Sequence, residues 1–137
     1  MAGNIVSGQE IGLWVADKMG GVLQPNSQCI GFVRDGKIVA GVIYEGWNSR
    51  SIVCHIAIDG VVTREFMKAV SAYAFITCGV HKVIGPIPSD NEKAIKNAIR
   101  IGFAEEARIK DAAPNGDIVL FTLTADKCRF LGAKHGK

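Results

Sequence analysis

The sequence predicts one domain of the α/β or α+β class, in which helices flank a mixed β-sheet. The apolar run Ser51–Ile58 is followed by a helical pattern and then by a second β run, His81–Pro88. A strand–helix–strand unit of this kind pairs its two strands in parallel. Asp35-Gly36, between two β-rich runs, is a strong hairpin signal and adds antiparallel strands. The 137 residues suit a single domain, residues 1–137, with its core expected within residues 7–131.

The first element is expected to be a helix that starts near Ser7 and stops at Gly20 and Gly21. Ser7 and Glu10 have the S-x-x-E spacing of a capping box. The apolar face of this helix carries Ile11, Trp14, Val15 and Met19. Residues 28–46 then form the two strands of the hairpin.

The run Ser51–Ile58 is expected to be a buried central strand, because it is apolar on both faces apart from His55. Strand alternation places Ile52, Cys54, Ile56 and Ile58 on one face and His55, with Val53 and Ala57, on the other. Thr63 is the expected N-cap of the long helix that follows, and Gly79 ends it. The apolar stripe of that helix is Phe66, Ala69, Val70, Tyr73 and Ile76.

The second half of the chain predicts one more helix between strands. The two prolines of "HKVIGPIP" predict irregular pairing near the end of that strand. Ser89 and Glu92 form a second capping-box pattern for the next helix, which ends at Gly102. The inward face of this helix is expected to carry Ile95, Ala98 and Ile99. The turn Pro114–Gly116 joins the last two strands.

The composition excludes several classes of function. Lys and Arg number 16 against 13 Asp and Glu, which gives a net charge of +3, and no basic block indicates a nucleic-acid partner. The four cysteines (Cys29, Cys54, Cys78 and Cys128) form no C-x-x-C pair, so no metal site is expected. No segment resembles a signal peptide or a membrane span, so free thiols in a cytoplasm, with no membrane partner, are expected.

The order of elements and the segment "SDNEKAIKNAIRIGF" resemble the GCN5-related N-acetyltransferases. That family has an Asn after its fifth strand, an Ala three residues later, a helix, and then Gly-Phe; here these are Asn91, Ala94, Gly102 and Phe103. A narrower resemblance is to small acetyltransferase-like proteins encoded by bacteriophages. It is carried by His55, Thr63-Arg64, Tyr73 with Phe75, and "CRFL" at Cys128–Leu131. Together the motifs cover Ser7 to Leu131.

The resemblance implies a central sheet with two splayed parallel strands that hold the pantetheine arm of acetyl-coenzyme A. The arm would lie between Cys54–Ile58, including Ile56 and Ile58, and Val83–Ile87, with Asn91 bonded to it. The diphosphate would lie at the start of the long helix, where helix dipoles favour anions. The residues expected there are Gly60, Val61, Val62, Thr63 and Arg64.

The sequence departs from the family pattern at two places. The loop before the long helix lacks the family's spaced glycines and contains Asp59, which would repel phosphate. Arg64 is expected to compensate, and to lie nearer to the diphosphate than Lys93; the alternative is that Thr63 is only a helix cap and Arg64 a solvated surface charge. The family's Tyr, which protonates the leaving thiolate, is replaced by Ala98. Tyr44, on the second strand of the hairpin, has a hydroxyl that could replace this missing acid. Packing against the sheet is the more common role of such a residue.

His55 is the best candidate for a base, since a neutral imidazole suits deprotonation of an ammonium acceptor; a buried structural His is the alternative. Glu45 can bind or deprotonate an amine, or be only a loop carboxylate. Trp14 and Trp47 can line an acceptor pocket, with Trp14 more typical of a core position. The helix that ends at Gly102 carries three cations on its outer face, Lys93, Lys96 and Arg100. These side chains are either solvated or bound to the 3′-phosphate of the coenzyme.

Three functions therefore stay open. The first is transfer of an acetyl group from acetyl-coenzyme A to a small-molecule or protein amine, in the cytoplasm of a bacterial host. The second is an inert component of a phage virion, bound to other virion proteins, and the third is a coenzyme A-binding module without turnover. A homo-oligomer is compatible with each. The parallel strands are expected to diverge near Ile58 and Pro86.

Overall fold

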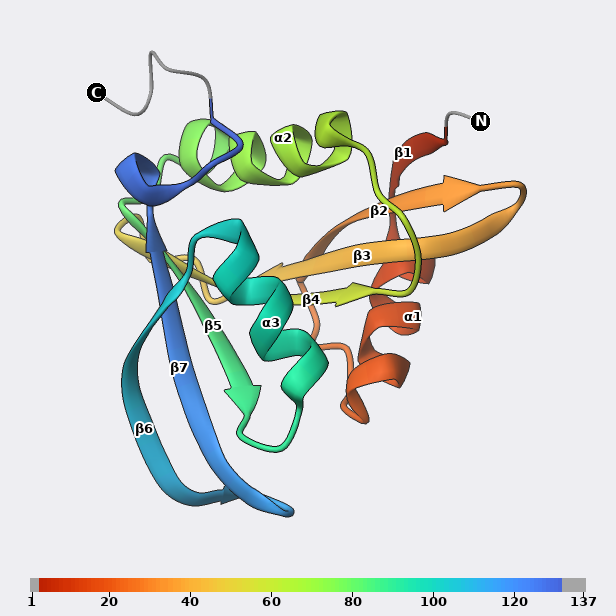
Figure 1. The fold of residues 1–137 in the computed structure, drawn as a ribbon. Coiled ribbons are helices and arrows are strands. Elements are labelled where there is room, and N and C mark those ends of the chain that lie inside the picture. Colours follow the sequence, from red (N-terminus) through yellow and green to blue (C-terminus); the bar gives the residue numbers. More distant parts are fainter. Residues whose placement is uncertain (1–2, 132–137) are drawn as a thin grey trace.

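The computed structural model describes residues 3–131 of the chain, which form one seven-stranded mixed sheet with helices on both faces (Figure 1). The strand order is β1-β2-β3-β4-β5-β7-β6. The strands are β1 (Asn4–Ser7), β2 (Gln28–Arg34), β3 (Lys37–Glu45), β4 (Ser51–Ile58), β5 (Lys82–Pro88), β6 (Ala104–Ala113) and β7 (Gly116–Thr124). The helices are α1 (Gln9–Met19), α2 (Arg64–Ala72) with a π-helical turn at Tyr73–Thr77, α3 (Glu92–Ile101) and a 3-10 turn at Ala125–Lys127.

The sheet separates two cores. Helix α1 packs on one face through Ile11 and Val15, which contact Ile43 of β3. Helices α2 and α3 share the other face, where Phe66 is fully buried at the centre of the larger cluster. Gly41 lets α1 approach the sheet closely, because a Cβ at that position would lie 2.6 Å from Val15. The mixed α/β class predicted by the sequence is confirmed.

The chain begins with a strand that the sequence did not predict. β1 pairs antiparallel with β2, and Ser7 lies opposite Ile30. Because Ser7 belongs to this strand, the first capping-box prediction is wrong: the N-cap of α1 is Gly8, with no side-chain hydrogen bond. The predicted apolar face is confirmed at Ile11 and Val15, whereas Met19 is exposed in the last turn.

The β2–β3 hairpin has the predicted two-residue turn. Arg34 pairs with Lys37, and the residues between them, Asp35 and Gly36, have φ values of +53° and +77°. Positive φ at both central residues is the geometry that an Asp-Gly pair favours.

Thr63 caps α2 as predicted, since its hydroxyl accepts a hydrogen bond from the Phe66 N–H at 3.1 Å. The π-helical turn that follows was not predicted. It adds a residue to the hydrogen-bonded ring and shifts the register of the apolar stripe. The predicted inward position of Ile76 is therefore wrong, because Ile76 is 51% exposed.

Helix α3 starts differently from the prediction. Asn91 is its N-cap and accepts from the Ala94 N–H at 3.2 Å. The Ser89 hydroxyl instead accepts from the Asp117 N–H at 3.0 Å, so the second capping box is wrong. The inward face includes Ile101 in place of Ile99, which is 53% exposed.

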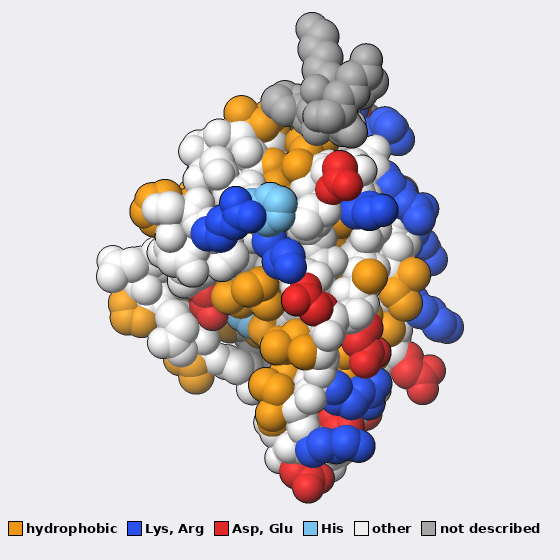
Figure 2. Space-filling view, turned by 90° about the vertical axis from the view of Figure 1, so that its left-hand side faces the viewer, with side chains coloured by type: hydrophobic (Ala, Val, Ile, Leu, Met, Phe, Trp, Pro, Cys, Tyr) orange, Lys and Arg blue, Asp and Glu red, His pale blue; other side chains and the backbone are white. Residues whose placement is uncertain are grey.

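The far edge of the sheet is β6, whose side chains are exposed until the last residue. Figure 2 views this side of the molecule, and acidic and basic side chains are interspersed over its lower part without a single-sign block. Interspersed charges discourage an edge strand from pairing with other chains. The turn before β7 falls at Pro114–Gly116 as predicted.

Among the described residues, no helix combines the length and the apolar character needed to cross a bilayer. The four cysteines are free; three are buried and Cys78 is half-buried.

Candidate active site

The centre of the sheet is opened by two strands that part. β4 and β5 are parallel, as predicted, and their pairing runs only from Ser51 to Val53 and from Lys82 to Ile84. Beyond these residues β4 continues to pair with β3, and β5 with β7. The divergence thus begins after Val53 and Ile84, earlier than the predicted Ile58 and Pro86. Pro86 and Pro88 have no N–H to offer, so β5 could not extend a full ladder toward β4.

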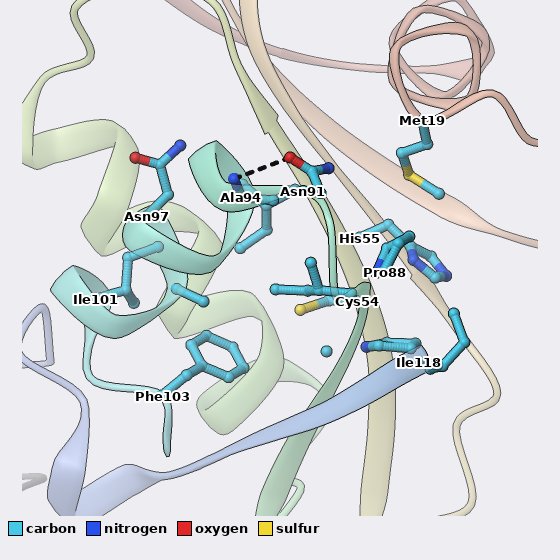
Figure 3. Close-up of a pocket in the computed structure, with 15 residues that line it drawn as sticks. Met19, Cys54, His55, Pro88, Asn91, Ala94, Asn97, Ile101, Phe103 and Ile118 are labelled. Atoms are coloured by element: carbon cyan, nitrogen blue, oxygen red, sulfur yellow. Dashed lines mark hydrogen bonds between the residues drawn. The ribbon is translucent and has the colours of Figure 1, made fainter. Parts of the chain in front are cut away.

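A cavity of about 240 Å³ occupies the gap between the parted strands (Figure 3). The walls come from β4, β5, β7, α1 and α3. They are mainly apolar, with His55, Asn91 and Asn97 as the polar exceptions. The lining residues are Met19, Cys54, His55, Ile56, Gly85, Pro86, Ile87, Pro88, Asn91, Ala94, Asn97, Ala98, Ile101, Phe103 and Ile118. An apolar cleft between unpaired strand edges suits a narrow chain that contains amide groups, because those edges supply backbone donors and acceptors.

Asn91 lies at the mouth of this cavity, where β5 passes into α3. Its side-chain oxygen is used in capping α3, as the dashed line in Figure 3 shows. The amide nitrogen of the same side chain makes no hydrogen bond within residues 3–131. The Asn91 amide NH2 group therefore keeps its N–H donors for a ligand in the cleft.

The turn between β4 and α2 contributes its first residue, Asp59, to the wall of the smaller cavity. Of the residues predicted to bind cofactor, Ile56 and Asn91 line the larger cavity, and Ile58 lines a smaller one beside it. Residues 60–64 line neither. The carbonyl of Val61 accepts from the Arg34 guanidinium at 2.5 Å, and Val62 packs against the core.

Arg64 begins α2, and its guanidinium lies 5.7 Å from the centroid of the Phe130 ring. The C-terminal segment thus holds this side chain by a cation–π contact. Cys128 is buried two residues before Phe130, and its thiol lies 3.4 Å from the Ser71 hydroxyl on α2. The sequence motif "CRFL" is therefore placed along α2, with Cys128 near the last turn and Phe130 near the first residue.

Asp59 is held by two lysines. Its carboxylate is 3.0 Å from the Lys18 ammonium of α1 and 3.9 Å from the Lys93 ammonium of α3. The hydrogen bond and charge of Lys18, with a smaller effect of Lys93, lower the pKa of the Asp59 carboxyl. Lys93 was expected to lie farther from the diphosphate than Arg64; its side chain reaches Asp59, the first residue after β4.

The imidazole of His55 faces the α1 side of the sheet, where its Nε2 lies 3.2 Å from Oε2 of Glu45. The two side chains are partly buried, with 16% and 28% exposed. His55 lies opposite Ile43 in the β3–β4 ladder and Glu45 lies opposite Val53, so the pair meets on a diagonal of the same face. The structure thus brings together two residues that the sequence proposed separately.

Tyr44 is not available as an acid. It is 3% exposed, and its hydroxyl donates to the Val70 carbonyl at 2.7 Å. Burial raises the pKa of the Tyr44 phenol well above its ordinary value. Its packing role, the alternative considered from the sequence, is confirmed. Ala98, at the family's Tyr position, lies in the cavity wall.

Cys54 lies where the strands part, and burial raises the pKa of its thiol to about 12. Such a thiol is a weaker acid than the ~8.5 of an ordinary thiol, so it cannot readily protonate a thiolate of that kind.

The remaining candidates separate clearly. Trp14 is partly buried against the α1 core and lines the smaller cavity, whereas Trp47 is 57% exposed and donates from its ring N–H to the Cys78 carbonyl. Lys96 and Arg100 are exposed on α3. Residues that the sequence reading missed in the cleft are Met19, Asn97 and Ile118. Of these three, only Asn97 could have been found from the sequence, because a polar residue on the apolar side of a helix is a candidate for binding a ligand.

This arrangement, a mixed sheet with two splayed parallel strands and an Asn-capped helix beside the gap, defines the fold of the GCN5-related N-acetyltransferases. No family model and no curated protein matches the sequence. Solved structures match the fold.

Among them is YncA, a putative acetyltransferase from Salmonella typhimurium solved with its cofactor acetyl-coenzyme A. It is 12% identical, with a TM-score of 0.69, and the match covers 97% of this chain and 99% of that one. An N-acetyltransferase from Staphylococcus aureus Mu50 is 11% identical with a TM-score of 0.68, over 90% and 99% of the two chains. A probable acetyltransferase is 21% identical with a TM-score of 0.62, over 73% of this chain and 62% of that one. The TM-scores show a shared fold, and at these low identities the likeness extends to the fold alone.

Proposed function

We propose that the protein is an N-acetyltransferase that uses acetyl-coenzyme A to acetylate an amine. The observation that carries the proposal is the apolar cleft between β4 and β5, which opens where their pairing stops and has Asn91 at its mouth. The unpaired strand edges and the free amide donor of Asn91 fit a pantetheine arm. The solved neighbours that contain acetyl-coenzyme A support this assignment.

In this proposal bound acetyl-coenzyme A supplies the activated acetyl thioester, and the chain supplies position and proton transfer. Cys54–Ile58 and Gly85–Pro88 hold the arm along its length. The backbone of Gly60–Thr63, together with Arg64, binds the diphosphate beside the start of α2, where N–H groups lack helical partners. Phe130 supports Arg64 there through the cation–π contact.

His55 is the proposed base. Its Nε2 faces Glu45, so the proton that the ring carries there is held by a carboxylate, and the other nitrogen, Nδ1, then has its lone pair free for the acceptor amine. Glu45 orients the ring and stabilises the imidazolium that forms when His55 takes the amine proton. The pair lies at the edge of the cavity on the α1 side, and an acceptor would approach from that side.

Among the described residues, none that lines the two cavities carries a hydroxyl group, so solvent protonates the leaving thiolate in this proposal. Loss of a general acid costs roughly 10²- to 10⁴-fold in rate, so turnover would be slow without being abolished. The same observation favours a second candidate, a coenzyme A-binding module without turnover. An inert virion component, which the narrower resemblance to phage-encoded proteins suggests, would bind no coenzyme A at all. The proposed site of action is the cytoplasm of a bacterial host.

An assay of acetyl transfer to a panel of primary amines, in which the release of free coenzyme A thiol is monitored, tests the catalytic proposal. Replacement of His55 by Gln should lower kcat by roughly 10²- to 10⁴-fold while acetyl-coenzyme A affinity stays the same. The matched control is His81→Gln, because His81 is exposed at the start of β5 and lines neither cavity. Equal activity of both variants would remove His55 from the mechanism. Binding without transfer in the wild-type protein would leave the binding module as the function.

A further inference from the structure

A three-charge cluster lies across one end of the splayed strands. Lys18 comes from α1, Asp59 from the turn after β4, and Lys93 from α3. All three line the smaller cavity, of about 140 Å³, together with Asn91 and Asn97. Both Asn residues also line the larger cavity, so the cluster is adjacent to the cleft that would hold the pantetheine arm.

The charges of this cluster do not balance. Two ammonium groups share one carboxylate, and within residues 3–131 no other acid pairs with Lys18 or Lys93. The region around Asp59 is therefore net positive, and it has capacity for a second anion.

We infer that Lys18 and Lys93 bind a phosphate group of the coenzyme, and that the Asp59 carboxylate holds these two ammonium groups in place until the phosphate arrives. The inference rests on the proposed function. It adds two phosphate-binding side chains, from α1 and α3, to the residues of the turn between β4 and α2. The side chains are 42%, 53% and 69% exposed for Lys18, Asp59 and Lys93, so the cluster is accessible to a ligand. Exposed ion pairs are weak and exchange readily, and a phosphate with more charge can displace one carboxylate.

The Asp59 carboxylate is expected to lower the affinity of this cluster for phosphate. Its negative charge lies at the point where a phosphate would approach, so it opposes binding while it keeps the lysines ordered. The carboxylate sets the affinity below what the two lysines alone would produce. This accounts for an acidic residue in a turn where phosphate is expected.

The opposite reading assigns Asp59 to a cationic acceptor. The Lys18 ammonium lies 5.3 Å from the centroid of the Trp14 ring and 3.0 Å from Asp59, which is how a substrate ammonium would be held. The excess of positive charge argues against it, because Lys18 and Lys93 would repel a cation.

Calorimetric titration of Lys18→Gln, Lys93→Gln and Asp59→Asn with coenzyme A and with pantetheine, which lacks all phosphates, tests the inference. Each Lys variant should weaken coenzyme A binding roughly 5- to 20-fold, as expected for an exposed charged contact, and leave pantetheine binding unchanged. Asp59→Asn should tighten coenzyme A binding. Titration with 3′-dephospho-coenzyme A distinguishes the phosphates: the Lys effects persist if the diphosphate is bound and vanish if the 3′-phosphate is bound.

Lys110→Gln is the matched control, since Lys110 is an exposed lysine on β6 that lines neither cavity. Lys variants that bind coenzyme A like wild type would overturn the inference while the proposed function stands. A wild-type protein that binds neither coenzyme A nor pantetheine would overturn both. If Asp59→Asn instead raises KM for the amine and leaves coenzyme A affinity unchanged, the carboxylate belongs to the acceptor site. Should a Lys variant fail to fold, the Asp59→Asn titration decides: tighter coenzyme A binding supports the inference, and equal or weaker binding overturns it.

Discussion

Replacement of Tyr44 by Phe separates a structural tyrosine from a catalytic one. The Tyr44 hydroxyl is buried and donates to the Val70 carbonyl at 2.7 Å, in the last turn of α2 before the π-helical turn. The substitution removes this hydrogen bond and leaves the carbonyl without that donor. A buried hydrogen bond contributes about 0.5–1.5 kcal/mol, so we expect the free energy of unfolding to fall by about 1 kcal/mol.

Urea unfolding followed by fluorescence measures this change, with an unaltered m-value as evidence that only stability has changed. In a domain of this size the loss corresponds to a fall in Tm of roughly 3–4 °C. Tyr73→Phe is the matched control. Its ring centroid lies 4.7 Å from that of Tyr44, and Tyr73 is only partly buried, so a smaller loss is expected.

The same variant tests whether Tyr44 acts as the missing acid. A structural hydroxyl predicts that any acetyl transfer by the wild-type protein survives in Tyr44→Phe within about twofold. A fall in kcat of roughly 10²-fold or more, with unfolding unchanged, would refute the reasoning and make Tyr44 the acid.

Three further predictions follow from single positions. Gly102→Ala should destabilise the protein far more than Gly20→Ala. Both glycines have positive φ, but only at Gly102 would a Cβ meet a backbone oxygen, at 2.6 Å; comparable Tm values in the two variants would contradict this. Asn91→Ala should cost about 1 kcal/mol through loss of the α3 cap and should also weaken coenzyme A binding, whereas unchanged stability would show that the cap contributes nothing. The hydrogen bond and charge of Lys18 lower the pKa of Asp59 in the folded state, so the stabilising effect of the contact is fully present above about pH 4 and is lost as the pH falls through the folded-state pKa. Wild type and Asp59→Asn should therefore differ in Tm at pH 7, and the difference should shrink as the pH falls below about 4; a constant difference would exclude this titration.

The sequence determined most of the fold, because hydrophobic periodicity and turn residues act locally. The Asp35-Gly36 hairpin, the Thr63 cap and the parallel pairing of β4 with β5 were all predicted from such patterns. The failures have local causes as well. β1 has only four residues, too few for a periodic signal, and Ser89 met a competing partner in the Asp117 N–H of a distant strand.

The site was less predictable, because its contacts join segments far apart in the chain. His55 and Glu45 were both candidates, but their contact depends on the register of the β3–β4 ladder, which the sequence leaves open. The Lys18–Asp59 contact spans 41 residues and requires the end of α1 to lie beside the end of β4. A sequence pattern carries no information on such placement.

The central claim is that the cleft between β4 and β5 binds acetyl-coenzyme A, and a thermal shift with a blocked variant tests it most directly. Ala94 lines both cavities, so Ala94→Trp should fill the cleft while the remote elements stay folded. At 100 times the dissociation constant, a ligand of the native state adds about 2.7 kcal/mol, which corresponds to a rise in Tm of roughly 8 °C. We expect that rise in the wild-type protein and none in Ala94→Trp. An unchanged Tm of the wild-type protein across millimolar acetyl-coenzyme A, or an equal rise in both proteins, would contradict the assignment of this cleft.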